Sequence, residues 1–291
     1  MTRTADTIQR VGIVGAGLMG AGIAEVCARA GLDVRVHESD RSTARAGRDR
    51  IARSLARAEK AGKLSAEERE QAYARIGVDT DIDQLGPCDL VVEAVSENAD
   101  AKVRVFRQLD EVVTRPDALL ASNTSSIPIT KIAMATRRAD RVIGLHFFNP
   151  VPVLRLVEVV PSLLTSQDTI ARGRAFVTDT LGKTVITSQD RAGFVVNSLL
   201  VPYILAAIRM LDSGVASAED IDSGMMLGCA HPMGPLRLAD LIGLDTVKAI
   251  AEAMHAEFAE PLYSPAPLLL RMVEAGLVGK KADRGFYDYR P

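Results

Sequence analysis

A histidine and a glutamate placed symmetrically about a proline are the first residues in this chain that could act on a substrate together. His146 and Glu158 each lie six positions from Pro152 in the stretch GLHFFNPVPVLRLVEVV. If residues 149–152 turn the chain, the two side chains become neighbours on adjacent strands. A carboxylate orients an imidazole and stabilises its protonated form, which is a device for acid/base catalysis. A structural histidine with a buried ion-pair partner is the alternative.

The strand expected over residues 153–160 places Glu158 on an apolar face. Alternation along that strand puts Glu158 on the same side as Leu154, Leu156 and Val160. A carboxylate on such a face is costly unless it is paired. The pattern therefore favours a partner for Glu158, and a turn would bring His146 to it.

Three glycines near the N-terminus indicate a dinucleotide-binding site. Gly15, Gly17 and Gly20 separate an apolar run from a helical pattern expected over residues 20–30. In this context the G-x-G-x-x-G fingerprint permits a tight turn, a close approach of the pyrophosphate, and close packing of helix on strand. The helix N-terminus supplies N–H groups and positive potential for the phosphates. A glycine-rich turn without a ligand is the alternative. The residues expected to contact the cofactor here are Gly15, Gly17, Leu18, Met19 and Gly20.

An acidic residue follows at the place where the fingerprint requires one, about 20 residues further on. Glu38 ends the strand-like segment VRVHE. A carboxylate there binds ribose hydroxyls and repels a 2′-phosphate, which favours NAD over NADP. Arg41 lies close by in the sequence and weakens that preference, so NADP stays an alternative cofactor. A solvated charge at a strand end is the other interpretation of Glu38.

Polar residues end two later strands of the predicted sheet. In an open parallel sheet, ligands bind beyond the carboxyl ends of the strands. The stretch ASNTSSIPIT follows one apolar strand, and EAVSEN follows another. A turn rich in backbone-bonding side chains is the alternative. Asn197, which opens an apolar helix, is either a ligand contact or a buried structural amide. The side chains of the first stretch that could bind a ligand are Ser122, Asn123, Thr124, Ser125 and Ser126.

Strand-like and helix-like segments alternate through the first part of the chain. Strands are expected in LDVRVHE, CDLVVEAV, ALLASNTSS, RVIGLHFFNP and TVITSQD, and helices at 41–62, 66–75 and 167–181. This alternation predicts an α/β Rossmann-type domain, a parallel sheet with helices on both faces. Later, helical patterns dominate at 195–212, from residue 217, and at 239–258. The predicted domains are residues 1–187, which bind NAD, and an all-α domain of residues 188–291.

The composition is that of an ordinary globular protein. Of the 291 residues, 47% are hydrophobic and 25% are charged, and the formal net charge is −2. This charge gives no reason to expect nucleic acid or a membrane surface as a partner. The three cysteines have neither metal-ligand nor disulfide spacing, which predicts no metal site and favours a reducing compartment. The N-terminus is too short and polar for a signal peptide, and the longest apolar stretch is too short to span a bilayer. We therefore expect a cytoplasmic protein.

On these motifs the chain resembles the L-3-hydroxyacyl-CoA dehydrogenase family in its short form, most of all its bacterial 3-hydroxybutyryl-CoA dehydrogenases. The resemblance implies an NAD-dependent oxidoreductase that interconverts L-3-hydroxyacyl-CoA and 3-oxoacyl-CoA, with short chains such as 3-hydroxybutyryl-CoA, in fatty acid or butanoate metabolism. The matching segments are GAGLMGAGIAEV, VVEAVSEN, ASNTSSIPIT, GLHFFNPVPV, LVEVV, LGKTV, GFVVNSLLVPY, HPMGPLRLADLIGLD and GKKADRGFYDY.

The resemblance also implies roles for individual residues. His146 matches the catalytic acid/base of the family, and Glu158 matches its orienting carboxylate. Ser125 matches the serine that bonds the substrate oxygen, and Asn197 matches an active-site asparagine of the helical domain. The positions that match cofactor-side residues are Glu97, Lys102 and Asn123.

The contact with CoA is less sharply defined. Ser54 matches a residue of the helix that contacts CoA in the family. The basic residues that accompany this serine in the family stand at other positions in this chain. Lys60, Arg57 and Lys63 are therefore all candidates for the contact with CoA. A solvated basic helix face is the alternative.

Other functions stay open beside this one. Enzymes of the same superfamily act on a free hydroxy acid such as L-gulonate, or on carnitine, and an acyl group on a carrier protein is another substrate. A non-catalytic NAD-binding protein, as lens crystallins are, is a third function. The serine cluster and the basic helix favour acyl-CoA, and the set of His146, Glu158, Ser125 and Asn197 argues for catalysis.

A homodimer through the helical domain is expected on two grounds. The segment VNSLLVPYILAAIRML is apolar nearly all round and must be buried on most faces. A domain of about 100 residues has little surface of its own to do this. The resemblance implies the same association. The alternative is that the dinucleotide domain covers these helices within one chain.

Overall fold

The computed structural model describes residues 8–290 and divides into two compact units between Arg191 and Ala192. The sequence placed this boundary slightly earlier, after residue 187. The connecting residues belong with the first unit because Asp190 accepts hydrogen bonds from the backbone N–H groups of Ile129 (2.6 Å) and Thr130 (2.7 Å).

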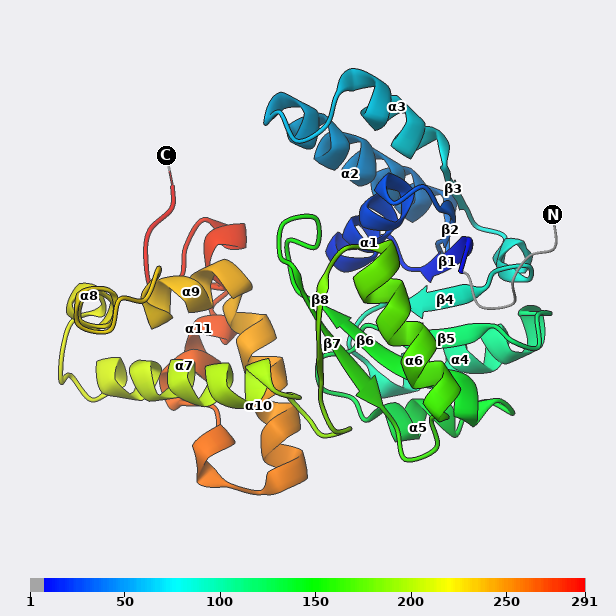
Figure 1. Ribbon diagram of the computed structural model, residues 1–291. Helices are drawn as coiled ribbons and strands as arrows, with labels where there is room; N and C mark the ends of the chain where they lie inside the picture. Colours follow the sequence, from blue (N-terminus) through cyan, green and yellow to red (C-terminus); the bar gives the residue numbers. More distant parts are fainter. Residues whose placement is uncertain (1–7, 291) are drawn as a thin grey trace. The chain divides into compact units, whose positions relative to one another are not determined.

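The first unit is built on one sheet of eight strands in the order β3-β2-β1-β4-β5-β6-β7-β8 (Figure 1). The paired strands run parallel except β6 and β7, which are antiparallel. The order reverses between β1 and β4, where a doubly wound sheet binds its ligand. The strands are β1 (Arg10–Val14), β2 (Asp33–His37), β3 (Ile76–Asp79), β4 (Leu90–Glu93), β5 (Leu119–Ser122), β6 (Val142–Phe147), β7 (Leu156–Pro161) and β8 (Thr184–Thr187).

Helices cover both faces of this sheet, as the alternating pattern predicted (Figure 1). Helices α1 and α6 lie over one face, and α4 and α5 lie over the other. Helices α2 and α3 form a hairpin that packs against α1. Their bounds are α1 (Leu18–Arg29), α2 (Arg41–Lys60), α3 (Ala66–Ala74), α4 (Ala99–Val112), α5 (Ile129–Ala133) and α6 (Gln167–Ala175).

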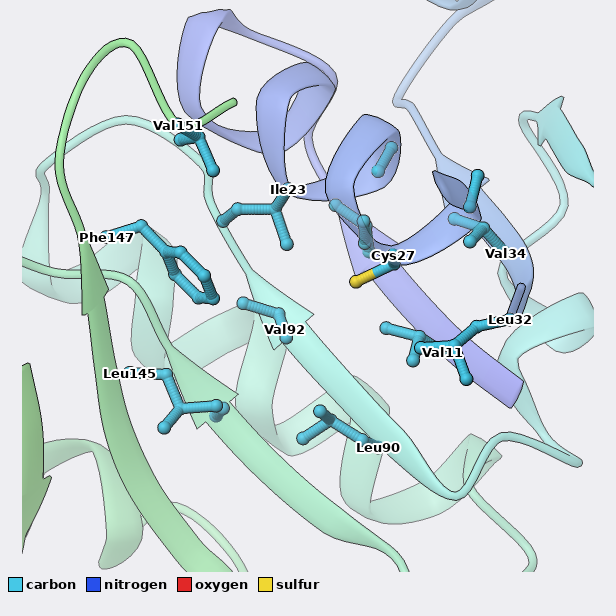
Figure 2. Packing of buried hydrophobic residues seen from close by; sticks show 14 of the residues in the cluster. Val11, Ile23, Cys27, Leu32, Val34, Leu90, Val92, Leu145, Phe147 and Val151 are labelled. Atoms are coloured by element: carbon cyan, nitrogen blue, oxygen red, sulfur yellow. The ribbon is translucent and has the colours of Figure 1, made fainter. Parts of the chain in front are cut away.

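The core beneath α1 fixes the direction of that helix. Ile23 and Cys27 are fully buried against the central strands, where Val11 and Val92 also have no exposure (Figure 2). Because α1 follows β1 directly, its N-terminus stands at the carboxyl edge of the sheet.

In three places the first unit differs in detail from what the sequence predicted. Strand β3 was missed because it is short, follows α3 immediately, and buries only Val78 fully. The helix expected over residues 167–181 is α6 followed by one wider turn at Phe176–Thr180. The strand expected from residue 153 begins at Leu156, because the backbone N–H groups of Val153 and Leu154 bond the carbonyl of Pro150 in a turn.

The second unit consists of helices α7 (Val196–Asp212), α8 (Ala218–Gly228), α9 (Pro235–Ile242), α10 (Leu244–Phe258) and α11 (Pro267–Glu274). The all-α prediction is confirmed. One helix expected over residues 239–258 is in fact two, because Gly243 interrupts it with a φ of +100°. Among residues 8–290, no helix is both long and apolar enough to cross a membrane.

Candidate active site

The three glycines of the β1–α1 loop have different surroundings. Gly15 has a φ of +94°, and a Cβ there would lie 2.8 Å from the carbonyl oxygen of Ala94. A Cβ on Gly20 would lie 1.8 Å from the carbonyl oxygen of Gly15. A Cβ on Gly17 would meet nothing within 4 Å. Gly15 and Gly20 are therefore needed by the turn and its packing, while the backbone at Gly17 borders open space.

This open space fits the pyrophosphate of NAD. Gly17 is the N-cap of α1, and no side chain caps its N–H groups. Leu18 is exposed and Met19 is half-buried at the same helix end. Uncapped N–H groups with positive potential are what a phosphate requires. The residues present therefore suit the cofactor that the sequence predicted.

Glu38 lies against the glycine-rich loop. Its Oε1 accepts a hydrogen bond of 2.5 Å from the backbone N–H of Ala16, and Arg50 donates to the carbonyl oxygen of the same residue. The carboxylate at the end of β2 thus stands at the ligand-binding edge of the sheet. Its part in ribose binding stays a prediction.

His146 and Glu158 are directly opposite each other on β6 and β7. Nδ1 of His146 lies 2.6 Å from Oε2 of Glu158, with residue exposures of 6% and 0%. The predicted cross-strand pairing is confirmed. The ring of Phe148 packs on the imidazole with 4.5 Å between ring centres. Both side chains are therefore held in one orientation inside the sheet.

The pair fixes which imidazole nitrogen can exchange a proton. An ionised carboxylate can only accept a hydrogen bond, so Nδ1 carries the hydrogen that faces Glu158. Nε2 is then the nitrogen suited to act as a base. Asn123, at the end of β5, accepts a hydrogen bond of 2.9 Å from the backbone N–H of Phe147. This bond links the end of β5 to β6 at the residue that follows His146.

Glu97 gathers the serine cluster that follows β5. Its Oε1 accepts hydrogen bonds from Thr124 Oγ1 at 2.5 Å and from the backbone N–H of Ser125 at 2.9 Å. It also accepts from the backbone N–H and the Oγ of Ser126. Burial raises the pKa of Glu97, but the charge of Lys102 and these hydrogen bonds outweigh it and hold that pKa below its usual value. The cluster that the sequence singled out is thus organised around one ionised carboxylate.

Lys102 is an almost fully buried cation. It is 1% exposed, and its Nζ lies 2.7 Å from Glu93 and 3.3 Å from Glu97. Sequence reasoning placed Lys102 and Glu97 on the cofactor side and missed Glu93. The available signal was a carboxylate at the end of the otherwise apolar strand LVVE.

Lys183 was also missed. Its Nζ donates hydrogen bonds of 2.7 Å to the carbonyl oxygens of Val151 and Leu154, in the connection between β6 and β7. Burial lowers the pKa of this lysine, and the charge of Arg29 lowers it further. No sequence pattern reveals this contact, because the bonded partners are backbone groups.

The remaining predicted residues lie on other elements. Ser54 is half-buried on α2, and Lys60 is exposed at its end. Arg57 and Lys63 are also exposed, so the choice among the basic residues stays open. Asn197 lies in the second unit, in the first turn of α7, with 8% exposure. The roles of these residues stay predictions.

The position of the histidine pair defines the class of protein. His146 stands near the carboxyl end of β6, which is the sheet edge that also carries the glycine-rich loop. A proton-transfer group at the edge where a dinucleotide binds is what a nicotinamide-dependent dehydrogenase requires.

Comparison with known proteins gives the family. Residues 10–191 match the description "3-hydroxyacyl-CoA dehydrogenase, NAD binding domain", and residues 193–289 match "3-hydroxyacyl-CoA dehydrogenase, C-terminal domain". The chain belongs to the 3-hydroxyacyl-CoA dehydrogenase family, whose cofactor is NAD.

Individual relatives agree with this assignment. The chain is 57% identical to a 3-hydroxybutyryl-CoA dehydrogenase of Mycobacterium tuberculosis, over 98% of this chain and 99% of the relative. It is 43% identical to the human mitochondrial hydroxyacyl-coenzyme A dehydrogenase, over 97% and 92% of the two chains. The crystal structure of (S)-3-hydroxybutyryl-CoA dehydrogenase PaaH1 from Ralstonia eutropha superposes with a TM-score of 0.91 at 49% identity, covering 98% and 100%.

Proposed function

We propose that this chain interconverts L-3-hydroxyacyl-CoA and 3-oxoacyl-CoA with NAD, and that 3-hydroxybutyryl-CoA is its substrate. The observation that carries the proposal is the contact of 2.6 Å between His146 and Glu158 at the ligand edge of the sheet. Relatives named 3-hydroxybutyryl-CoA dehydrogenase match nearly the whole chain and support the choice of substrate. A place in fatty acid or butanoate metabolism is proposed on the family resemblance, and a cytoplasmic location is proposed on the sequence features given above.

In the oxidative direction, Nε2 of His146 takes the proton of the 3-hydroxyl group while a hydride leaves C3. In the reductive direction, the imidazolium returns that proton to the 3-oxo oxygen. Glu158 orients the ring and stabilises its charged form. NAD, when bound along the glycine-rich loop, supplies the acceptor for the hydride. Acid/base assistance of this kind contributes about 10²–10⁴-fold to the rate.

Other residues are proposed to position the reactants. Ser125 donates a hydrogen bond to the substrate oxygen, and Asn197 of the second unit is proposed for the same oxygen on the resemblance alone. Ser54 and Lys60 of α2 are proposed as contacts of CoA. On the cofactor side, we propose the loop from Gly15 to Gly20 together with Glu38, Glu97, Lys102 and Asn123.

The test is the formation of NADH from three substrates offered at equal concentration: L-3-hydroxybutyryl-CoA, the same acyl group on a carrier protein, and free L-gulonate. We expect the CoA ester to give the highest kcat/KM. A higher kcat/KM for either other substrate would replace acyl-CoA in the proposal. Binding of NADH without turnover of any of the three would indicate a non-catalytic protein.

We also propose a homodimer through the second unit. That unit exposes large apolar side chains, among them Leu199 on α7 at 75% and Leu227 on α8 at 87%. A twofold interface would bury them, and twofold dimers are the commonest oligomers. Light scattering at micromolar concentration should give twice the mass of 31.2 kDa. A mass of one chain that persists on concentration would contradict the dimer.

A further inference from the structure

Glu93 is a fully buried carboxylate that the proposed chemistry does not use. It ends β4 at the ligand edge of the sheet and has 0% exposure. Its Oε1 accepts hydrogen bonds of 2.7 Å from Val95 N–H and from Lys102 Nζ, and its Oε2 accepts one of 2.6 Å from Ser122 Oγ. Both oxygens are therefore engaged, which explains how a charge is retained at this depth.

Lys102 depends on Glu93 more than on its other partner. The lysine lies in the first turns of α4, where the helix dipole disfavours a cation. Glu93 contacts it at 2.7 Å and Glu97 contacts it at 3.3 Å. The shorter contact comes from the rigid end of a central strand. The buried cation is thus anchored by Glu93 and shared with Glu97.

Glu97 connects the anchored Lys102 to the serine cluster. Its side chain is 31% exposed and comes from the connection before α4, so its position depends on the groups that it contacts. On one side it faces Lys102, and on the other it accepts from residues 124–126, among them the backbone N–H of Ser125 at 2.9 Å. The Oγ of Ser125 makes a longer contact of 3.3 Å, so its hydroxyl hydrogen can be donated to the substrate instead. Ser122 donates a hydrogen bond to Glu93 and lies opposite Glu93 in the register of β4 and β5. Ser122 also comes directly before the serine cluster in the sequence.

The geometry points to Glu93 as a positioning residue for the reaction: through Lys102 and Glu97 on one path, and through Ser122 on the other, it holds Ser125 in place for the substrate oxygen. This inference rests on the proposed substrate contact of Ser125. Glu93 itself does not touch the substrate. Both series of contacts from Glu93 end at the loop of residues 123–127. A residue that only held β4 and β5 together would not need these contacts, because backbone hydrogen bonds already join the two strands.

The test replaces Glu93 by glutamine, which has the same shape and no charge. The matched control is Glu25→Gln, because Glu25 on α1 is also 0% exposed and ion-paired, with Arg29, outside this network. Amide hydrogen exchange in residues 123–127 should become about tenfold faster in Glu93→Gln and stay unchanged in the control. We expect kcat to fall about 10- to 100-fold in Glu93→Gln and to stay within about threefold of the wild type in Glu25→Gln.

A double-mutant cycle with Ser125→Ala separates positioning from general damage. If Glu93 acts through Ser125, its replacement costs much less activity in the Ser125→Ala background than in the wild type. Additive losses would overturn the inference, and so would unchanged hydrogen exchange at residues 123–127. If Ser125→Ala alone keeps wild-type kcat, the substrate contact of Ser125 fails, and the exchange result still decides whether Glu93 holds the loop.

A milder variant covers the case in which Glu93→Gln does not fold. Ser122→Ala removes one of the three donors to Glu93 and the acceptor of the hydrogen bond of 3.2 Å from the backbone N–H of Thr124, and it leaves the ion pair with Lys102 intact. We expect the same pattern at smaller size, with kcat reduced about threefold and faster exchange confined to residues 123–127. Wild-type kcat and exchange in this variant would show that the path through Ser122 does not operate.

Discussion

Nδ1 of His146 and Oε2 of Glu158 lie 2.6 Å apart at directly paired positions of the antiparallel strands β6 and β7. The register of the two strands places the residues opposite each other, and the burial of both side chains restricts them to this contact. Lys183 adds a second constraint, since it bonds two carbonyl oxygens of the connection between the strands.

Removal of the imidazole should slow catalysis strongly and leave cofactor binding nearly unchanged. We expect His146→Ala to lower kcat about 10²–10⁴-fold, because the proton of the hydroxyl loses its acceptor. The glycine-rich loop lies on a different strand, so the Kd of NADH should change little. Steady-state kinetics and fluorescence titration with NADH measure the two quantities. A kcat near the wild-type value would remove His146 from the mechanism.

Neutralising Glu158 should have a smaller and pH-dependent effect. Glu158→Gln keeps the shape of the side chain and removes the charge that stabilises the imidazolium. Oxidation requires the neutral ring, so the acid limb of the kcat profile should move to lower pH, with a smaller loss of kcat than in His146→Ala. Profiles between pH 5 and pH 9 test this. A profile with an unmoved acid limb would mean that the two side chains do not act together.

Substitution of Gly17 and substitution of Gly20 should affect different properties of the protein. Gly17 has a φ of −61°, and its Cβ would meet nothing within 4 Å, so Gly17→Ala should fold normally and bind NADH about tenfold more weakly. Gly20→Ala would place a Cβ 1.8 Å from a backbone oxygen and should lower the melting temperature. Melting curves and NADH titration distinguish the two. Equal melting losses in both variants would contradict this division of roles.

Glu38 should set the preference for NAD over NADP. Glu38→Ala removes both the charge that repels a 2′-phosphate and a proposed hydrogen-bond partner of the ribose, so the ratio of kcat/KM for the two cofactors should narrow. Glu38→Gln separates these effects, because the amide still accepts from Ala16 N–H. Both variants should lose discrimination, and the glutamine variant should keep more activity with NAD. Unchanged ratios would show that Glu38 does not read the 2′ position.

Local patterns in the sequence predicted the parts of this structure that depend on short-range geometry. The pairing of His146 with Glu158 followed from alternation along a strand and from one turn. The α/β domain and the helical domain followed from the period of the apolar residues. In these cases the physical requirement lies within about 15 consecutive residues, so it leaves a pattern that can be recognised.

Long-range contacts left no such pattern. Asp190 bonds Ile129 and Thr130 across 61 and 60 positions, and with this contact the first unit extends beyond residue 187. Lys183 bonds carbonyl oxygens, which every residue possesses. Glu93 ends an apolar strand, and only the fold shows that Lys102 reaches it. Such contacts depend on tertiary packing, which local propensity does not encode.

An ion-pair cluster between α4 and the chain before β6 should make stability depend on acid pH. Asp110 is 6% exposed and accepts hydrogen bonds from Arg137 Nε at 2.8 Å and Arg138 Nε at 3.0 Å. Burial raises the pKa of Asp110, but these two guanidinium groups outweigh it and hold that pKa below its usual value. The stabilisation is therefore complete above the unfolded value of about 3.9 and is lost as the pH falls through the lower folded value.

We expect Asp110→Asn to lower the melting temperature at pH 7 by about 2–8 °C, because the charge-assisted hydrogen bonds are lost. Since the variant has no carboxyl group to protonate at this position, its melting temperature should fall less steeply than that of the wild type below about pH 4. Asp288→Asn is the control, because Asp288 is paired with Arg290 in an exposed position where an ion pair contributes little. If the melting temperatures of the wild type and of Asp110→Asn fall equally steeply across this pH range, the cluster does not control acid stability.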